Sequence, residues 1–158
     1  MRTPDTNRRP SGRFVRLALA AVCVTLLGGV LAGCESTKPD LDAVRNDINQ
    51  SRIDAGLAPL VENVVLDMKA DQWAQALRDQ CRIWHSRLAD GAPPEWMKLG
   101  ENVGMGGNID QVHVAYMNSP GHKANILDPK FTAIGTAAVW GDCNGYHTVF
   151  TVQEFMSS

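Results

Sequence analysis

The sequence predicts an α+β fold, a three-layer α-β-α sandwich around a small antiparallel sheet. Two β-rich apolar runs, at 131–140 and 146–156, are joined by a turn that contains Asn144 and Gly145, a residue pair typical of a tight β-hairpin. Apolar residues fall on both faces of each run, so other elements must cover the sheet on two sides. The segments before the hairpin have helical patterns and supply the two outer layers.

Four helices are expected before the hairpin. The first begins at Asp40, its expected N-cap, and ends at Gly56. His85 lies one turn beyond the second helix's Cys81, so it is expected at the edge of that helix's buried face. In this second helix, apolar side chains recur at the spacing of one helix face, at Leu66, Ala70, Trp73, Leu77, Cys81 and Trp84.

The third and fourth helices meet at a sharp turn. Asn108 and Gln111 form a capping pair that opens the third helix, and Ser119 with Pro120 opens the fourth. His122 falls in the first turn of the fourth helix, where unpaired N–H groups and the positive end of the helix dipole disfavour a proton on its imidazole. A neutral imidazole is what a metal ligand or a hydrogen-bond acceptor requires.

Two classes of ligand are disfavoured by the sequence. The glycine-rich segment 104–107 lacks both the preceding apolar strand and the Gly-Lys-Ser/Thr ending of a phosphate-binding loop. Without residues 1–33 the chain has 10 basic and 16 acidic residues, a formal charge of −6 with neutral histidines. An acidic domain is a poor partner for nucleic acid or for an anionic membrane surface.

Residues 1–33 have the organisation of a signal peptide. Arginines precede an uncharged apolar run at 17–30, and small residues follow it up to Cys34. A membrane-spanning helix is the alternative, but it would need about 20 apolar residues, more than this run contains. Leu31-Ala32-Gly33-Cys34 resembles the lipobox of bacterial lipoproteins, in which the cysteine thiol takes a diacylglycerol and becomes the new N-terminus. The resemblance implies an extracytoplasmic protein anchored to the cell membrane through Cys34, because two or more acyl chains give stable anchoring.

This interpretation divides the chain into a signal peptide (1–33), a lipidated N-terminus and tether (34–40) and one folded domain (41–158). Two cysteines, Cys81 and Cys143, remain in the folded domain. In an oxidising compartment they are expected to form one disulfide, which closes a loop of about 60 residues and contributes about 3 to 4 kcal/mol. A zinc site that uses both thiols is the alternative, and the lack of a short Cys-x-x-Cys spacing argues against it.

The segment 41–155 resembles the short bacterial form of the CAP superfamily, which is named for cysteine-rich secretory proteins, antigen 5 and pathogenesis-related proteins and has an SCP-like domain. Four motifs carry the resemblance, and they follow one another in the order found in that family. The resemblance implies an α-β-α sandwich with a three-stranded antiparallel sheet, one strand of which lies near a Gly-Glu-Asn motif. The motifs are Asn49-x-x-Arg52-x-x-x-Gly56-Leu57-x-Pro59-Leu60, Trp84-His85-Ser86, Gly100-Glu101-Asn102-Val103 and Met117-Asn118-Ser119-Pro120-Gly121-His122-Lys123-Ala124-Asn125-Ile126-Leu127.

The resemblance also implies a cleft lined by two histidines and two glutamates. His85, Glu101 and His122 match three of these positions, and Ser119 occupies the place of the second glutamate. The two imidazoles and the carboxylate would give a divalent cation such as Zn²⁺ three protein ligands and open positions. Each residue has a plainer interpretation: His85 as an ordinary histidine at a core edge, Glu101 as an acceptor for backbone N–H groups, and Ser119 as a helix cap.

Three functional classes follow. The favoured class is a non-enzymatic extracytoplasmic binding module whose cleft takes a divalent cation or a small ligand. The second is a metal-dependent hydrolase, which needs a general base besides the metal ligands, and Ser119 in place of the second glutamate leaves no spare carboxylate. A serine mechanism is disfavoured, because neither Ser86 nor Ser119 lies in a Gly-x-Ser-x-Gly elbow. The third class is an envelope interaction protein with a purely structural cleft.

Overall fold

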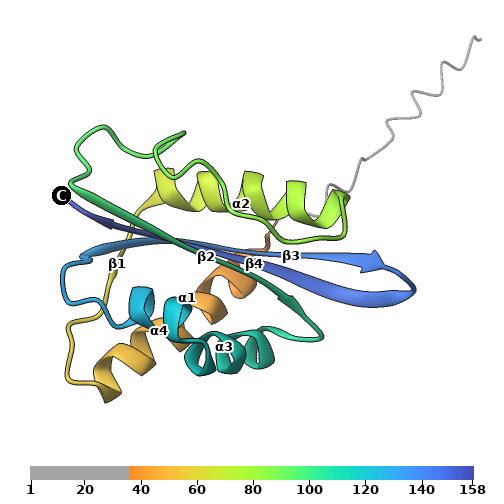
Figure 1. Ribbon diagram of the computed structural model, residues 1–158, viewed down its shortest axis with the longest axis horizontal. Coiled ribbons are helices and arrows are strands. Elements are labelled where there is room, and N and C mark those ends of the chain that lie inside the picture. Colours follow the sequence, from red (N-terminus) through yellow and green to blue (C-terminus); the bar gives the residue numbers. More distant parts are fainter. Residues whose placement is uncertain (1–35) are drawn as a thin grey trace, which may run out of the picture. The chain divides into compact units, whose positions relative to one another are not determined.

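The computed structural model describes residues 36–158, and the predicted signal peptide and Cys34 lie outside that range. The domain has three layers, with a central sheet between helices on either side (Figure 1). This is the α-β-α sandwich that the sequence predicts. Within 36–158, no helix is both long and apolar enough to cross a membrane.

Four strands form the sheet in the order β1-β3-β4-β2. β2 (Lys98–Gly106), β3 (Ala133–Cys143) and β4 (Tyr146–Ser157) pair antiparallel, and β4 lies between the other two although it comes last along the described chain. β2 is the strand implied near the Gly-Glu-Asn motif. The two-residue β1 (Val61–Glu62) pairs parallel to β3, and the sequence did not predict it because two residues carry no periodic pattern.

The hairpin between β3 and β4 closes at the predicted Asn-Gly turn. Asn144 and Gly145 both have positive φ, 54° and 83°, as the type I′ turn of a two-residue hairpin loop requires. β3 continues to Cys143, so the turn is shorter than the segment 141–145 expected from the sequence.

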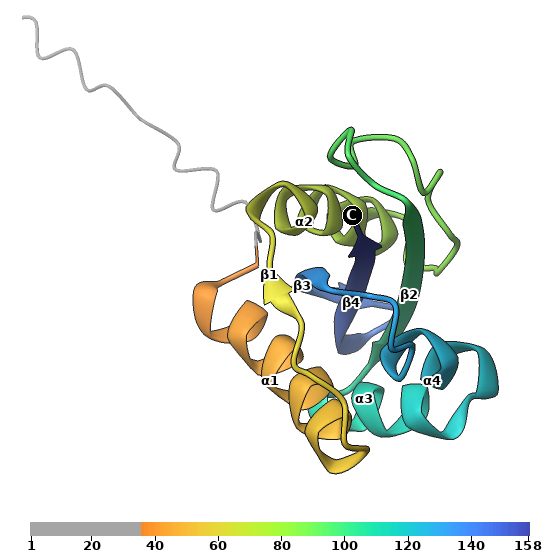
Figure 2. The ribbon, with the colours of Figure 1, turned by 90° about the vertical axis from the view of Figure 1, so that its left-hand side faces the viewer.

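Helices cover the two faces of the sheet unequally (Figure 2). α2 (Val64–Asp79) lies alone on one face, and α1 (Lys38–Asp54), α3 (Ile109–Asn118) and α4 (Pro120–Ile126) lie together on the other. His122 is in α4 and therefore belongs to the three-helix layer.

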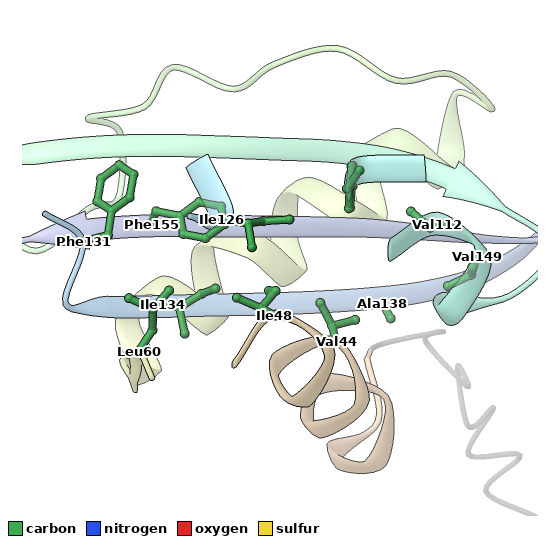
Figure 3. Close-up of a cluster of buried hydrophobic side chains, with 11 residues drawn as sticks. Val44, Ile48, Leu60, Val112, Ile126, Phe131, Ile134, Ala138, Val149 and Phe155 are labelled. Carbon is green, nitrogen blue, oxygen red and sulfur yellow. The ribbon is translucent and has the colours of Figure 1, made fainter. Parts of the chain in front are cut away.

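Alternate residues of the central strands fill two separate cores. On the three-helix side, Ile134 and Ala138 of β3 pack with Phe155 of β4 and with residues of all three helices (Figure 3). On the other side, Val139 and Phe150 pack against the buried face of α2. This alternation explains why both strands are apolar along most of their length.

The first helix begins earlier than the sequence suggested. Its N-cap is Thr37, whose hydroxyl oxygen accepts the backbone N–H of Asp40, so Asp40 lies inside the first turn and is not the cap. Pro39 is also in the first turn, where its missing N–H costs nothing. Helical structure therefore starts inside the segment 34–40 that was expected to be a tether.

The second helix ends earlier than the sequence predicted. α2 stops at Asp79, and Cys81 takes a left-handed conformation with φ 48° that a helix interior does not allow. Cys81 forms the predicted disulfide with Cys143, so the chain turns here toward the end of β3. Trp84 and His85 lie in an irregular segment and not on α2, although they continue its apolar spacing.

A buried arginine joins α1 to the end of α4 and to the segment that follows it. Arg52 is 2% exposed, and its guanidinium donates to four backbone carbonyls, those of Ala58, Ile126, Asp128 and Phe131, at 2.8 to 3.3 Å. Burial lowers the pKa of Arg52, as desolvation does for any cation. The guanidinium thereby fixes the C-terminal end of α4 against α1.

Replacing Arg52 should destabilise the domain strongly. Arg52→Met leaves the four carbonyls without this donor, and we expect the free energy of unfolding to fall by about 3 kcal/mol or more. Arg52→Lys keeps the charge but loses the planar fork of donors, so its free energy of unfolding should fall by less than that of Arg52→Met. Urea unfolding followed by tryptophan fluorescence measures both variants, and a Met variant as stable as the wild type would contradict the role assigned to these bonds.

Gly135 of β3 allows α2 to approach the sheet closely. A Cβ at this position would lie closer than 3.0 Å to backbone atoms of Leu66 and Asp67. Gly135→Ala is therefore expected to lower the free energy of unfolding by about 3 kcal/mol or to prevent folding. Gly121→Ala is the matched control, because nothing lies within 4 Å of its added Cβ. Equal melting temperatures for the two variants would mean that α2 packs less tightly than described.

Candidate functional site

His85 and Glu101 form a hydrogen-bonded pair at the edge strand β2. His85 Nδ1 lies 2.7 Å from Glu101 Oε1, and the imidazole is 61% exposed whereas the carboxylate is fully buried. Both oxygens of Glu101 also accept the backbone N–H of Ser86, at 3.0 and 3.3 Å. Because a carboxylate only accepts, Nδ1 carries the proton of this bond, and in the neutral imidazole Nε2 keeps its lone pair.

Trp73 and Trp84 position the segment that carries His85. The indole N–H of Trp73, on α2, donates to the backbone carbonyl of Trp84 at 2.9 Å. The two rings pack edge to face with their centroids 5.2 Å apart. These contacts hold the irregular segment against α2 one residue before His85, in place of the helical contacts that the spacing suggested.

His122 approaches the same region from α4. Its imidazole packs against Tyr116 of α3, with ring centroids 4.9 Å apart. Burial, and then the charge of His85, lower the pKa of His122, so this imidazole stays neutral. The direction agrees with the sequence expectation, and burial and the neighbouring histidine add to the effect expected from the helix N-terminus. The two imidazoles are therefore near enough for the charge of His85 to act on His122.

An amide network fixes α4 to the sheet behind the two histidines. Asn102 of β2 donates through Nδ2 to the His122 carbonyl at 3.1 Å and to Gln153 Oε1 at 2.9 Å. Asn125 of α4 donates through Nδ2 to the Glu101 carbonyl at 3.2 Å and to Asn102 Oδ1 at 2.9 Å. Side chains of β2, β4 and α4 thus set the position of His122 relative to Glu101.

A second carboxyl group lies directly behind Glu101. Glu154 of β4 is buried and opposite Glu101 in the sheet register. Burial, and then the nearby charge of Glu101, raise the pKa of Glu154 to about 8, and the Lys69 ammonium, which contacts Glu154 Oε1, acts in the opposite direction. Lys69 also donates to Ser86 Oγ at 2.9 Å. Glu154 therefore carries the proton of the carboxyl pair at neutral pH, and Glu101 remains the acceptor for His85 and Ser86.

Sequence reasoning missed Lys69 and Glu154, although the sequence contains a signal for both. Lys69 follows Leu66 by three residues, on the buried side of α2, and Glu154 stands between Gln153 and Phe155 in an apolar strand. A charged residue at a buried position requires a partner. Two such residues, one basic and one acidic, indicate that their side chains contact each other inside the fold.

The structure brings His85 and Glu101 into contact and places His122 nearby, and it places Ser119 where the sequence expects it, at the start of α4. Ser119 occupies the N-cap position of α4 and makes no capping hydrogen bond with its side chain. Among residues 36–158, no three His, Cys, Asp or Glu side chains are grouped so that they could hold a metal ion. A direct ligand role for Glu101 stays a prediction, and its contacts give it the role of orienting His85.

The three-layer fold, with the Gly-Glu-Asn motif on β2 joined by amides to the histidine motif on α4, is that of an SCP-like domain. The model of the cysteine-rich secretory protein family, CAP, matches residues 45–155, and the chain belongs to this family. A curated relative, the protein YkwD of Bacillus subtilis (strain 168), is 35% identical over 100 residues, which cover 58% of this chain and 39% of that protein. The match thus spans about two fifths of the relative's length.

Solved structures share this fold. An outer surface protein of Borrelia burgdorferi has a TM-score of 0.63 and 22% identity, over 77% of this chain and 94% of that chain. An extracellular protein containing an SCP domain from Bacillus anthracis has a TM-score of 0.60 and 20% identity, over 75% and 40% of the two chains. Venom allergen-like protein 4 of Schistosoma mansoni has a TM-score of 0.57 and 14% identity, over 75% and 89%. At these identities the comparison establishes the fold.

The raised pKa of Glu154 makes stability depend on pH. Its folded-state value of about 8 exceeds the ordinary 4.5, so the folded protein binds the extra proton between these values and loses stability as the pH rises. One pKa unit corresponds to about 1.4 kcal/mol, so we expect a loss on the order of a few kcal/mol from pH 5 to pH 8. The Glu154→Gln variant has no group to ionise at this position, so its stability should fall much less over the same pH range.

Urea unfolding of the wild type and Glu154→Gln at pH 5, 6.5 and 8 measures this difference. The comparison is needed because burial of His122 lowers its pKa and changes stability with pH in the opposite direction. The same pH dependence in both proteins would assign the effect to groups other than Glu154.

Proposed function

We propose that the protein is an extracytoplasmic, lipid-anchored CAP-domain protein that acts as a non-enzymatic binding module. Its ligand site comprises His85 and His122 and would take a divalent cation or a small polar ligand. The observation that carries the proposal is the exposed His85 imidazole held through Nδ1 by the fully buried Glu101. A carboxylate in this position fixes the ring and its tautomer, as the carboxylate–histidine pairs behind metal ligands do.

The donor set at this site fits a cation that accepts imidazole nitrogen. Zn²⁺ binds neutral imidazoles, and here burial lowers the pKa of His122, while the bond of Nδ1 to Glu101 leaves Nε2 as the nitrogen of His85 that could bind the metal. Glu101 supports His85 from behind, so the protein would supply two ligands and water or a bound ligand would supply the others. Such a site should bind Zn²⁺ more weakly than a site with three or four protein ligands.

A metal-dependent hydrolase is the second candidate and has less support. It needs a general base close to an activated water. Glu101 is buried and bonded to His85 and Ser86, and Glu154 behind it is protonated and contacts Lys69. Neither carboxylate is therefore available to take a proton from a water at the site.

The proposed location has three supports. The segment Leu31-Ala32-Gly33-Cys34 favours cleavage before Cys34 and acylation of its thiol. Proteins with this fold are described as an outer surface protein in Borrelia burgdorferi and as an extracellular protein in Bacillus anthracis. The disulfide between Cys81 and Cys143 suits an oxidising compartment.

Calorimetric titration of Zn²⁺ into the domain 35–158 tests the site. We expect binding near one equivalent that is lost in His85→Ala and in His122→Ala, because each variant removes one of two imidazoles. Glu101→Gln should weaken binding by about tenfold or more, since it alters the group that orients His85. His147→Ala, which changes an exposed histidine of β4, is the matched control and should bind as the wild type does.

Two other results would change the functional class. No Zn²⁺ binding by the wild type would contradict the cation site and favour an envelope interaction protein, whose partner would still bind after His85 and His122 are both replaced by alanine. Zinc-dependent hydrolysis of an ester or amide that is lost with either histidine would favour the hydrolase.

A further inference from the structure

The described chain starts against the middle of α2. The backbone N–H of Ser36 donates to Asp71 Oδ1 at 2.9 Å, and the Ser36 hydroxyl oxygen accepts the N–H of Ala138 in β3 at 3.0 Å. Thr37 then caps α1. From Ser36 onward the chain is therefore fixed to the folded domain through α1, α2 and β3 together.

Very little chain separates this attachment from the residue proposed to carry the lipid. Only Glu35 lies between Ser36 and Cys34. Two residue steps of extended chain span about 7 Å, which is less than the diameter of one helix, about 10 Å. Acyl chains on Cys34 would therefore hold the surface around Ser36 and Asp71 at the bilayer.

The surface beside Asp71 is apolar. Val64, Met68 and Asp71 lie on one stripe of α2, at positions i, i+4 and i+7. Val64 is 66% exposed and Met68 60%, and the adjacent Val65 is 48% exposed. These three apolar residues form what we call the apolar face of α2. Single exposed apolar residues are ordinary, but a cluster next to an attachment point indicates a contact surface.

An apolar pocket continues this face. It has a volume of about 720 Å³ and lies between α2 and the segment 86–91. Most of its α2 wall is apolar, whereas the facing segment contributes polar and charged residues. The α2 wall consists of Val65, Met68, Trp73 and Ala76 with Lys69 and Gln72, and the other wall of Ser86, Arg87, Asp90 and Gly91. The hydrocarbon surface next to the attachment point is therefore hollowed and extends beyond the three exposed side chains.

We infer that the apolar face of α2 lies against the phospholipid bilayer that holds the Cys34 anchor. The inference rests on the proposed lipid anchor and adds an orientation to it. A spacer of one residue keeps this face at the bilayer at high effective concentration, so a weak apolar contact suffices. Because the domain without residues 1–33 has a formal charge of −6, apolar contact and not charge holds it there, and anionic lipid should weaken the contact.

Other occupants of this face agree less well with the short spacer. A protein partner would have to fit between the face and a bilayer that begins about 7 Å from Ser36. An acyl chain of the anchor could instead fold back into the pocket, and the domain would then leave the membrane. Both alternatives give results that differ from those expected for bilayer contact.

Spin labelling of the acylated protein in phosphatidylcholine vesicles tests the orientation. Acylation blocks the thiol of Cys34, and Cys81 and Cys143 form a disulfide, so an introduced cysteine is labelled selectively. Met68→Cys reports on the apolar face of α2. Val114→Cys, at a 58% exposed position of α3 in the opposite helix layer, is the matched control.

We expect the ratio of collisions with oxygen to collisions with a water-soluble nickel complex to be severalfold higher for the label at Met68 than at Val114. Equal ratios, in protein that sediments with the vesicles, would overturn the orientation and leave the anchor intact. Acylated protein that stays in solution would also overturn the orientation and would favour an acyl chain in the pocket. Mass spectrometry that finds Cys34 unmodified would overturn the anchor and the orientation with it.

Discussion

The buried guanidinium of Arg52 is the constraint on which the three-helix layer, with His122 in α4, depends. Its charge is buried without a carboxylate in hydrogen-bonding contact and faces four backbone carbonyls. A planar group with five donors can bind carbonyls from several segments at once, which an ammonium cannot do. The end of α4 and the path from α4 into β3 are set by these bonds, and so is the position from which His122 extends toward β2.

The two histidines of the site are held in opposite ways. His85 is exposed and fixed through a hydrogen bond from behind, whereas His122 is partly buried against Tyr116 and stays neutral. Behind them, burial raises the pKa of Glu154, which lies between Glu101 and Lys69. Lys69 contacts Glu154, and Glu101 accepts hydrogen bonds from His85 and Ser86, so most polar atoms of this buried cluster have partners, although Glu154 Oε2 has none.

The sequence predicted the features that local signals determine. The Asn-Gly hairpin, the cap at Asn108 and a sheet covered on both faces follow from turn chemistry and periodicity, and the family resemblance located β2. The end of α2 could not be predicted, because Trp84 continues the helical spacing after the left-handed Cys81 has ended the helix. The contact between Glu101 and Glu154 depends on the register of strands about 50 residues apart, which no local pattern encodes.

The central position of β4 has a consequence for how the domain is made. Among residues 36–158, β2 pairs with β4 alone and β3 has only the two-residue β1 as its other neighbour, so this sheet cannot form before β4 is present. A chain that leaves a narrow translocation channel from its N-terminus exposes β2 and β3 long before β4. If the chain is exported as proposed, the sheet would be completed only after β4 emerges on the far side, where oxidants can join Cys81 to Cys143.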